Sequence, residues 1–175
     1  MRRAGDRARP GPTGRRLGGR VTQLGGLPMG ARPAGPVVYA AHPVTTYGTD
    51  LERTALARLA ELLPGATVID PCDRYRDAEH WLEDWPALLP TLSALIVFGA
   101  PDATVGTGCL HELADAWWCG MPVAMLDRAG ALRHLVGLRM IADADRDRFR
   151  TATLVPGQPM DLAPLIGLSD AGDQP

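Results

Sequence analysis

Lysine is absent from this chain of 175 residues, and all 18 of its Lys+Arg positions are Arg. That absence excludes Schiff-base catalysis, which uses a Lys amine, and the nucleotide-binding P-loop, whose Lys contacts the phosphates. Cysteine is scarce as well, since Cys72, Cys109 and Cys119 are the only three and form no CxxC pair. An odd, unclustered set of cysteines is typical of a reducing compartment, so we expect a cytoplasmic protein.

Long apolar runs and clustered histidines are also lacking. No stretch approaches the roughly 20 apolar residues that a membrane span requires, so we expect no membrane partner. His80 and His134 have no partner at metal-ligand spacing, and we predict neither a metal site nor a cofactor. No GxGxxG follows the first apolar run, which argues against a dinucleotide-binding unit.

Positive charge is concentrated at the start of the chain. Residues 1–35 hold eight Arg and one Asp, whereas the remainder holds ten Arg and nineteen acidic residues. An acidic body is a poor partner for a phosphate backbone, so we do not expect nucleic-acid binding, although the basic segment itself is an alternative contact. Residues 1–35 are mostly Arg, Gly and Pro. They bury too little apolar surface to offset the entropy of ordering, so we predict a disordered leader.

From residue 36 onward, short apolar runs alternate with segments of helical spacing. This alternation is typical of a parallel sheet covered on both faces. We predict one α/β domain over residues 36–160, followed by a loose tail at 161–175. The expected fold is a flavodoxin-like, doubly wound, mostly parallel sheet of about five strands with helices on both faces. The predicted strands are 37–41, 67–69, 95–98, 123–126 and, more weakly, 138–142 and 151–155, and the predicted helices are 49–62, 78–92 and 108–119.

Ligands of doubly wound sheets bind beyond the carboxyl ends of the strands, and this rule selects the loops 42–49, 70–77 and 99–108. These loops hold His42, Asp70 and Asp102, which we predict to contact a ligand. The alternative for His42 is a loop histidine bonded to backbone, and the alternative for the 70–77 loop is a solvated turn.

A glycine-rich helix start is the most informative stretch of the sequence. Residues 106–112 read Gly-Thr-Gly-Cys-Leu-His-Glu. Free backbone N–H groups at a helix start, together with the helix dipole, favour an anion or a cluster of hydroxyl groups, and we predict that Thr107 and Gly108 bind the ligand there. Glu112 lies one turn later and reaches the same place. The alternative is a surface Glu stabilised by the dipole.

The residues around Glu112 resemble a family signature. The pattern Gly108-x-x-x-Glu112-Leu113-x-x-Ala116-x-x-x-Gly120-x-Pro122-Val123 is similar to that of nucleoside 2-deoxyribosyltransferases and related nucleotide N-glycoside hydrolases. The run Tyr39-Ala40-Ala41-His42-Pro43 resembles the first strand of that family. The resemblance covers residues 36–127. It implies a flavodoxin-like fold, a homo-oligomer, a Tyr in the site and a Glu nucleophile that attacks the anomeric carbon of the sugar.

The chain departs from the family pattern where a second acid is expected. The family has an Asp six residues before the nucleophile, where this chain has Gly106, and Asp102 is the substitute in the same loop. The family also has an Asp in the helix before the third strand, and Asp84 is the nearest match, with a spacing different by about two residues. We therefore predict Glu112 as nucleophile, Tyr39 as the residue that orients it, and Asp84 or Asp102 as the acid that protonates or holds the departing base.

Two functions from different classes follow from these residues. The first is cleavage or transfer at the N-glycosidic bond of a nucleoside or nucleoside 5′-monophosphate, with water or a second base as acceptor. The second is a sensor module of the same fold that binds a nucleotide or nucleotide-sugar without turning it over. Of the adjacent Trp117 and Trp118, we expect one in the core and the other in a subunit interface. Trp81 and Trp85, one turn apart, are expected to pack together.

Overall fold

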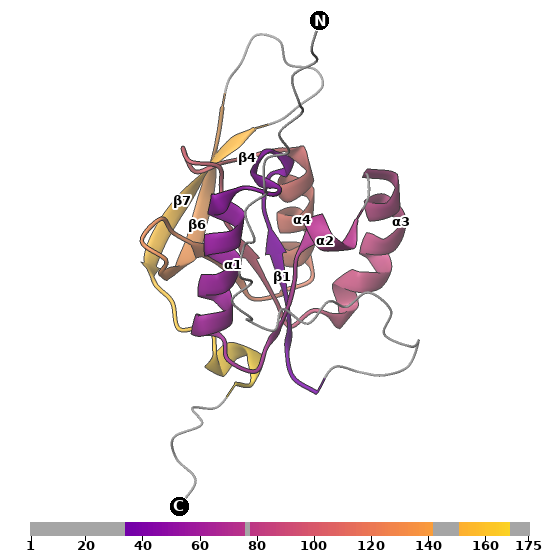
Figure 1. Cartoon of the computed structure of the whole chain (residues 1–175), viewed down its shortest axis with the longest axis vertical. Helices are drawn as coiled ribbons and strands as arrows, with labels where there is room; N and C mark the ends of the chain where they lie inside the picture. Colours follow the sequence, from indigo (N-terminus) through magenta and orange to yellow (C-terminus); the bar gives the residue numbers. More distant parts are fainter. Residues whose placement is uncertain (1–33, 76–77, 142–150, 169–175) are drawn as a thin grey trace, which may run out of the picture.

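The computed structural model describes residues 34–75, 78–141 and 151–168. The predicted leader lies outside the described residues except for positions 34 and 35. The helices are α1 (Asp50–Leu62), α2 (Pro71–Arg74), α3 (Ala78–Leu88) and α4 (Thr107–Trp118), with 3₁₀ turns at Val44–Thr46, Leu89–Thr91 and Pro164–Ile166. The strands are β1 (Val37–Ala41), β2 (Thr67–Ile69), β3 (Ala94–Val97), β4 (Thr104–Val105), β5 (Val123–Leu126), β6 (Leu132–Met140) and β7 (Ala152–Pro159). The chain is an α/β protein (Figure 1).

The sheet is larger than predicted and mixed. Its seven strands have the order β2-β1-β3-β5-β6-β7-β4. The strands β2, β1, β3 and β5 are parallel, as the alternation of apolar runs and helices predicted. The strands β6, β7 and β4 are antiparallel to their neighbours. The expectation of about five mostly parallel strands is therefore corrected to four parallel strands with an antiparallel extension.

A short turn explains why the sheet changes direction after β5. The connection from Leu126 to Leu132 is too short for the crossover of a dozen or more residues that a parallel neighbour requires. Asp127 and Gly130 close the turn: the N–H of Asp127 donates to the carbonyl of Ala131, and Gly130 has a φ of 75°. A left-handed φ is accessible to Gly without strain. The chain therefore reverses and β6 pairs antiparallel with β5.

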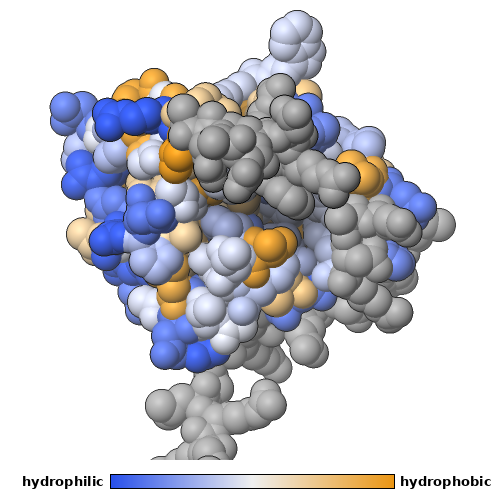
Figure 2. Space-filling view, turned by 90° about the horizontal axis from the view of Figure 1, so that it is seen from above, coloured by the Kyte–Doolittle hydropathy of each residue, from blue (hydrophilic) through white to orange (hydrophobic). Residues whose placement is uncertain are grey.

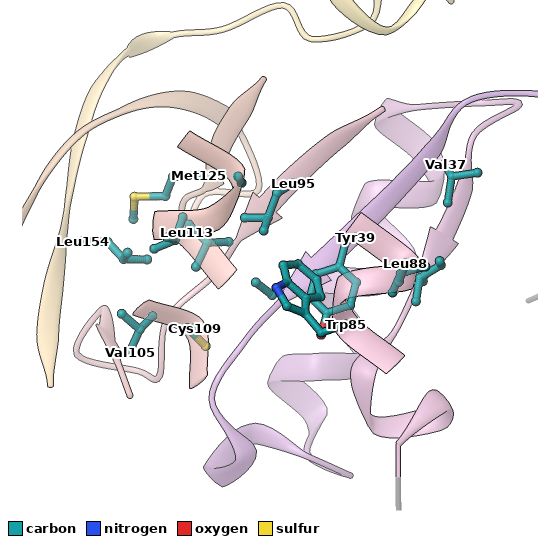
Figure 3. Packing of buried hydrophobic residues seen from close by; sticks show 14 residues of the cluster. Val37, Tyr39, Trp85, Leu88, Leu95, Val105, Cys109, Leu113, Met125 and Leu154 are labelled. Atoms are coloured by element: carbon teal, nitrogen blue, oxygen red, sulfur yellow. The ribbon is translucent and has the colours of Figure 1, made fainter. Parts of the chain in front are cut away.

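The two faces of the sheet bury separate apolar clusters. Side chains alternate between the faces of a strand. Val37, Tyr39 and Ala41 of β1 belong to the cluster on the α3 and α4 side, whereas Val38 and Ala40 belong to the cluster on the α1 side. Figure 3 shows the first cluster, in which Tyr39 lies against a Trp of α3 and side chains of α4 approach from the other direction. All five β1 residues are buried, so β1 positions side chains on both faces of the sheet.

The helices begin and end close to their predicted bounds, with one difference. The predicted helix at 78–92 ends at Leu88 and is followed by a 3₁₀ turn. Pro86 lies inside α3, and because a proline has no N–H to donate, it weakens the last turn. At α1 the hydroxyl of Thr49 accepts from the backbone N–H of Glu52, and the Glu52 carboxylate accepts from the N–H of Gly48 instead of that of Thr49.

The segment 161–168, expected to be part of a loose tail, packs on the α1 side of the sheet. Leu162 is only 1% exposed and joins the apolar cluster of that face. This correction has a physical reason, since antiparallel β7 returns the chain to the edge of the core. Seen from above (Figure 2), hydrophilic residues gather along one side of the molecule and hydrophobic ones form separate patches. Within the described ranges, no helix is long and apolar enough to span a bilayer.

Candidate active site

Glu112 occupies a core position of α4. The buried residues of this helix are Cys109, Glu112, Leu113 and Ala116. Their spacing of three, one and three residues places all four on one helix face, which packs against the sheet. Three of the four are apolar or small, and the exception is a carboxylic acid that is 5% exposed. A carboxylate in an apolar stripe is costly to bury, so its position requires specific partners.

Two donors hold the Glu112 carboxylate by the same oxygen. The hydroxyl of Tyr39 donates to Oε1 at 2.5 Å, and the indole N–H of Trp81 donates to Oε1 at 2.9 Å. Both of these hydrogen bonds end on Oε1. The Tyr39 contact predicted from the sequence is present. Because both donors lie on rigid elements, β1 and α3, they fix the direction in which Oε2 points.

Burial makes the Glu112 carboxyl a weak acid. Desolvation raises the pKa of Glu112 from 4.5 to about 7. The hydrogen bonds from Tyr39 and Trp81 lower this pKa, but their effect is smaller than that of burial. Burial, followed by the Glu112 charge, also raises the pKa of Tyr39, so its hydroxyl stays protonated and donates. A carboxyl that is half ionised near neutral pH is suited to act as a nucleophile or as a general acid and base.

An aromatic wall supports the two donors. The rings of Tyr39 and Trp85 lie 5.1 Å apart, and those of Trp85 and Trp81 lie 6.1 Å apart and stack. The indole N–H of Trp85 donates to Asp115 of α4 at 2.8 Å. His111 meets the Trp81 ring edge-on at 5.4 Å. The Trp pair is therefore more than the packing stripe that the sequence suggested, because each indole N–H joins α3 to α4.

Two further tyrosines lie in the electrostatic neighbourhood of Glu112. The pKa of Tyr75 is raised to about 12, first by burial, and the Glu112 charge contributes. The pKa of Tyr47 is raised by burial and then by Glu112. The Tyr75 hydroxyl is buried and has no hydrogen-bond partner among the described residues. An unsatisfied buried hydroxyl beside a carboxylate is a group to which a polar ligand can bind.

Asp84 lies away from the carboxylate that it was predicted to assist. Its Oδ2 accepts from Arg74 at 2.6 and 2.8 Å, and its side chain is 42% exposed. The Arg74 guanidinium lies 5.7 Å from the centre of the Tyr75 ring. The role of Asp84 as the second acid stays a prediction.

The start of α4 is open, as the glycine pattern predicted. Gly106 is the N-cap and no side chain caps the helix. A Cβ at Gly106 or Gly108 would have no heavy atom within 4 Å, so a ligand can approach the backbone. Thr107 and Gly108 are exposed there. The side chain of Asp102 is bonded within its own loop, because its Oδ1 accepts from the N–H and the hydroxyl of Thr104.

The loop before α4 is fixed by a tight turn and by β7. Ala103 has a φ of 64°, which a non-glycine residue seldom adopts. A Cβ at Gly99 would lie 2.5 Å from the carbonyl carbon of Ala103, so only glycine fits. The carbonyl of Ala103 accepts from the N–H of Leu154 in β7. The antiparallel extension therefore holds the loop that leads to Glu112.

His42 and Asp70, predicted separately as ligand contacts, bind each other. Nε2 of His42 is 3.1 Å from Oδ1 of Asp70 and 3.6 Å from Oε1 of Glu52. The His42 ring stacks on Phe98 at 4.5 Å and meets the Tyr47 ring edge-on at 4.9 Å. Tyr47 therefore contacts the His42 ring, and the charge of Glu112 also acts on Tyr47. The His42 cluster and the Glu112 cluster are thus neighbours.

The sequence analysis did not predict Trp81, Tyr47 and Glu52 as members of the two clusters. The signal available for Trp81 was its N–H, because a buried indole needs an acceptor. A shallow surface hollow lies along α1, and its lining residues include none of those that hydrogen-bond Glu112. Those residues are Asp50, Arg53, Thr54, Ala57, Arg58 and Glu61.

Comparisons with known proteins do not identify this arrangement. No protein-family model, no curated protein and no solved structure gives a significant match to the chain. Its chemistry must therefore be inferred from the residues around Glu112.

Proposed function

We propose that this protein cleaves the N-glycosidic bond of a nucleoside or nucleoside 5′-monophosphate, with Glu112 as the nucleophile. The observation that carries the proposal is the Glu112 carboxylate itself, which is buried on the inner face of α4 and held through one oxygen by Tyr39 and Trp81. Oε1 accepts both of these hydrogen bonds, and Oε2 is the atom we assign to attack at the anomeric carbon.

The chemistry of glycosyl transfer explains why such a carboxylate is useful. Cleavage passes through an oxocarbenium-like state, which a nearby carboxylate stabilises or traps as a covalent glycosyl enzyme. The donors on Oε1 keep the carboxylate oriented without blocking Oε2. The aromatic side chains of Trp81 and Tyr75 offer surfaces against which a nucleobase can stack. The open start of α4 supplies backbone N–H groups for sugar hydroxyls or for a 5′-phosphate.

The fold supports the resemblance on which the substrate class rests. The order β2-β1-β3-β5 of the parallel strands is that of the first four strands of a flavodoxin-like sheet. In such sheets the ligand lies beyond the carboxyl ends of the strands, where His42 and Asp70 follow β1 and β2. Hydrolysis and transfer differ only in whether water or a second base resolves the glycosyl enzyme.

A homo-oligomer is part of the same proposal. Trp118, at the end of α4, is 93% exposed and its neighbour Trp117 is 42% exposed, so neither Trp lies in the core as one was expected to. Trp is favoured in the buried centre of protein interfaces. An exposed indole at the end of the helix that carries Glu112 is a natural contact between two copies of this chain.

A second candidate function is a sensor that binds the same class of ligand without cleaving it. The observation that favours it is the position of Asp84, which pairs with Arg74 instead of facing Glu112. Gly106 also replaces the acid of the resembled family. In a sensor, Glu112 would hold a ligand hydroxyl and no group would protonate the departing base.

One experiment separates the two functions. The purified chain is incubated with nucleosides, deoxynucleosides and their 5′-monophosphates, with and without a free acceptor base, and released base is followed by chromatography. The enzyme proposal predicts base release by the wild type and none by Glu112→Ala. Release should rise with pH through about 7, because the attacking carboxylate must be ionised and its pKa is about 7.

The outcomes differ clearly between the hypotheses. Thermal stabilisation by one member of the panel without base release supports the sensor. Base release that survives in Glu112→Ala contradicts the assignment of the nucleophile. A larger product yield on addition of a second base identifies the transferase.

A further inference from the structure

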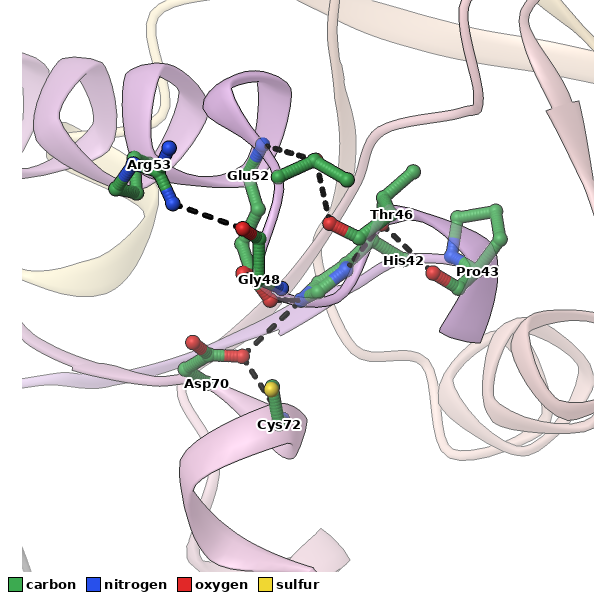
Figure 4. A network of polar contacts seen from close by, with 9 residues as sticks. His42, Pro43, Thr46, Gly48, Glu52, Arg53, Asp70 and Cys72 are labelled. Carbon is green, nitrogen blue, oxygen red and sulfur yellow. Dashed lines mark hydrogen bonds and ion pairs between the residues drawn. The ribbon is translucent and has the colours of Figure 1, made fainter. Parts of the chain in front are cut away.

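A second group of polar side chains converges where β1, α1 and β2 meet. His42 follows β1, Glu52 lies in the first turn of α1, and Asp70 follows β2. Nε2 of His42 is 3.1 Å from Oδ1 of Asp70 and 3.6 Å from Oε1 of Glu52. The three potential ligand atoms all lie within 4.8 Å of one another. Figure 4 shows the imidazole directed at the two carboxylates, beside the loop that follows β1.

The hydrogen bonds of Thr46 fix the tautomer of His42. The Thr46 hydroxyl donates its single proton to the carbonyl of Pro43 at 2.7 Å. The same oxygen lies 2.7 Å from Nδ1 of His42, so the hydroxyl accepts and Nδ1 carries the ring proton. Nε2 of the neutral ring then presents a lone pair to two carboxylates. A histidine that donates from one nitrogen to a fixed acceptor and turns the other toward carboxylate oxygens is arranged as metal-ligating histidines are.

The carboxylate of Glu52 has an unsatisfied oxygen at the same point. Its Oε2 accepts from the N–H of Gly48 at 2.5 Å. Its Oε1 is buried without a hydrogen-bond partner, and the side chain is only 6% exposed. Among the described residues, no Arg pairs with Glu52 or Asp70. Glu52 is buried and Asp70 is partly buried. Two such carboxylates close together without an Arg are costly, and a bound cation would reduce that cost.

We propose that His42, Glu52 and Asp70 bind one divalent transition-metal ion through one nitrogen and two carboxylate oxygens. For a metal about 2.1 Å from both atoms of a pair, the two separations that include His42, 3.1 and 3.6 Å, correspond to ligand–metal–ligand angles of about 95° and about 118°. The two carboxylate oxygens lie within 4.8 Å of each other, and binding of one ion by both requires a separation below about 4.2 Å. Such angles suit a tetrahedral or five-coordinate ion with water in the remaining positions. One imidazole with two carboxylates matches Zn²⁺ or Mn²⁺.

The proposed site departs from the expectation that the chain binds no metal. The sequence analysis did not indicate it, because its three ligands are distant in sequence and show no spacing signature. The proposal does not rest on glycosidic cleavage at Glu112. A bound ion would tie the loop after β1 to α1 and to the end of β2, and would therefore stabilise the edge of the sheet that carries both clusters.

The test is metal binding by the full chain after removal of metal with a chelator. Zn²⁺ alone and Mn²⁺ alone are titrated by calorimetry, and thermal unfolding is recorded with and without the ion. We expect one ion per chain and a rise in melting temperature of about 5 °C. Glu52→Gln and Asp70→Asn should each weaken binding at least about tenfold, and Thr46→Val should weaken it about tenfold through the tautomer. The control variants are Glu61→Gln and Asp73→Asn, which replace exposed acids on α1 and α2. Both should bind the metal as the wild type does.

Circular dichroism confirms that each variant is folded before its affinity is compared. Wild-type affinity in Asp70→Asn would overturn the proposal by locating the ion elsewhere. Absence of saturable binding to the wild type at about ten equivalents of metal would also overturn it. Nitrogen NMR supplies a second readout: a proton on Nε2 of His42 that persists when metal is added would show that a proton, not an ion, joins the two carboxylates.

Discussion

Replacement of Glu112 by Gln should stabilise the fold while it abolishes base release. The amide keeps a carbonyl oxygen that accepts from Tyr39 and Trp81, but it carries no charge to bury. The wild-type carboxyl has a pKa of about 7 in the folded chain against 4.5 for the ordinary group. That difference corresponds to about 3 kcal/mol of free energy of unfolding. At pH 8 the wild type, with its ionised carboxyl, should therefore be less stable than Glu112→Gln by about 3 kcal/mol.

The sign of the pH dependence follows from the direction of this shift. Because the folded pKa of Glu112 is raised, its contribution to stability is present below pH 4.5 and is lost as the pH rises through about 7. The Gln variant lacks this loss. The stability difference between variant and wild type should therefore be small at pH 4.5 and grow to about 3 kcal/mol at pH 8.

Urea unfolding followed by Trp fluorescence at pH 4.5, 6, 7 and 8 measures this difference. Glu61→Gln is the matched control, because the Glu61 side chain is 66% exposed on α1 and pairs with Arg58 at the surface. The control should show a difference that does not change with pH by more than about 0.5 kcal/mol. A pH-independent difference for Glu112→Gln would refute the claim that Glu112 is a buried carboxyl with a raised pKa.

Three further predictions concern the neighbours of Glu112. Tyr39→Phe removes a donor that stabilises the Glu112 carboxylate, so the pH midpoint of base release should move up by about one pH unit. Cys109→Ala should keep base release within about threefold and lose about 1 to 2 kcal/mol of stability by urea unfolding, because a buried thiol whose pKa is raised by burial is a filler and not a nucleophile. Trp118→Ser should lower the mass measured by light scattering, whereas Leu165→Ser, an exposed apolar residue elsewhere, should leave it unchanged.

The sequence predicted the parallel half of the sheet because its strands are continuous apolar runs. β1, β2, β3 and β5 were found within one residue at each end. The antiparallel half was harder to predict, because most positions of β6 and β7 are only partly buried or exposed and the two strands contain Gly137 and Gly157. β4 has only two residues, too few for any periodic signal, and it exists because β7 offers it an edge.

For the candidate active site, the sequence predicted the contact between Tyr39 and Glu112 but not the other residues around that contact. Tyr39 and Glu112 were predicted to meet because a strand end and a helix start lie at the same edge of a doubly wound sheet. Trp81 was predicted to pack, and its N–H bond to Glu112 depends on the orientation of α3, which no spacing encodes. Asp84 was matched to a family position by proximity in sequence, and its pairing with Arg74 is decided by the tertiary fold.

A trapped covalent intermediate tests whether the carboxylate of Glu112 attacks the sugar. Turnover of the substrate identified by base release is quenched with acid within milliseconds, and the peptides are mapped by mass spectrometry. We predict that the α4 peptide of the wild type gains the mass of the sugar at Glu112, and that Glu112→Gln shows neither this adduct nor base release. An adduct on another residue, or base release by Glu112→Gln at the wild-type rate, would contradict the claim.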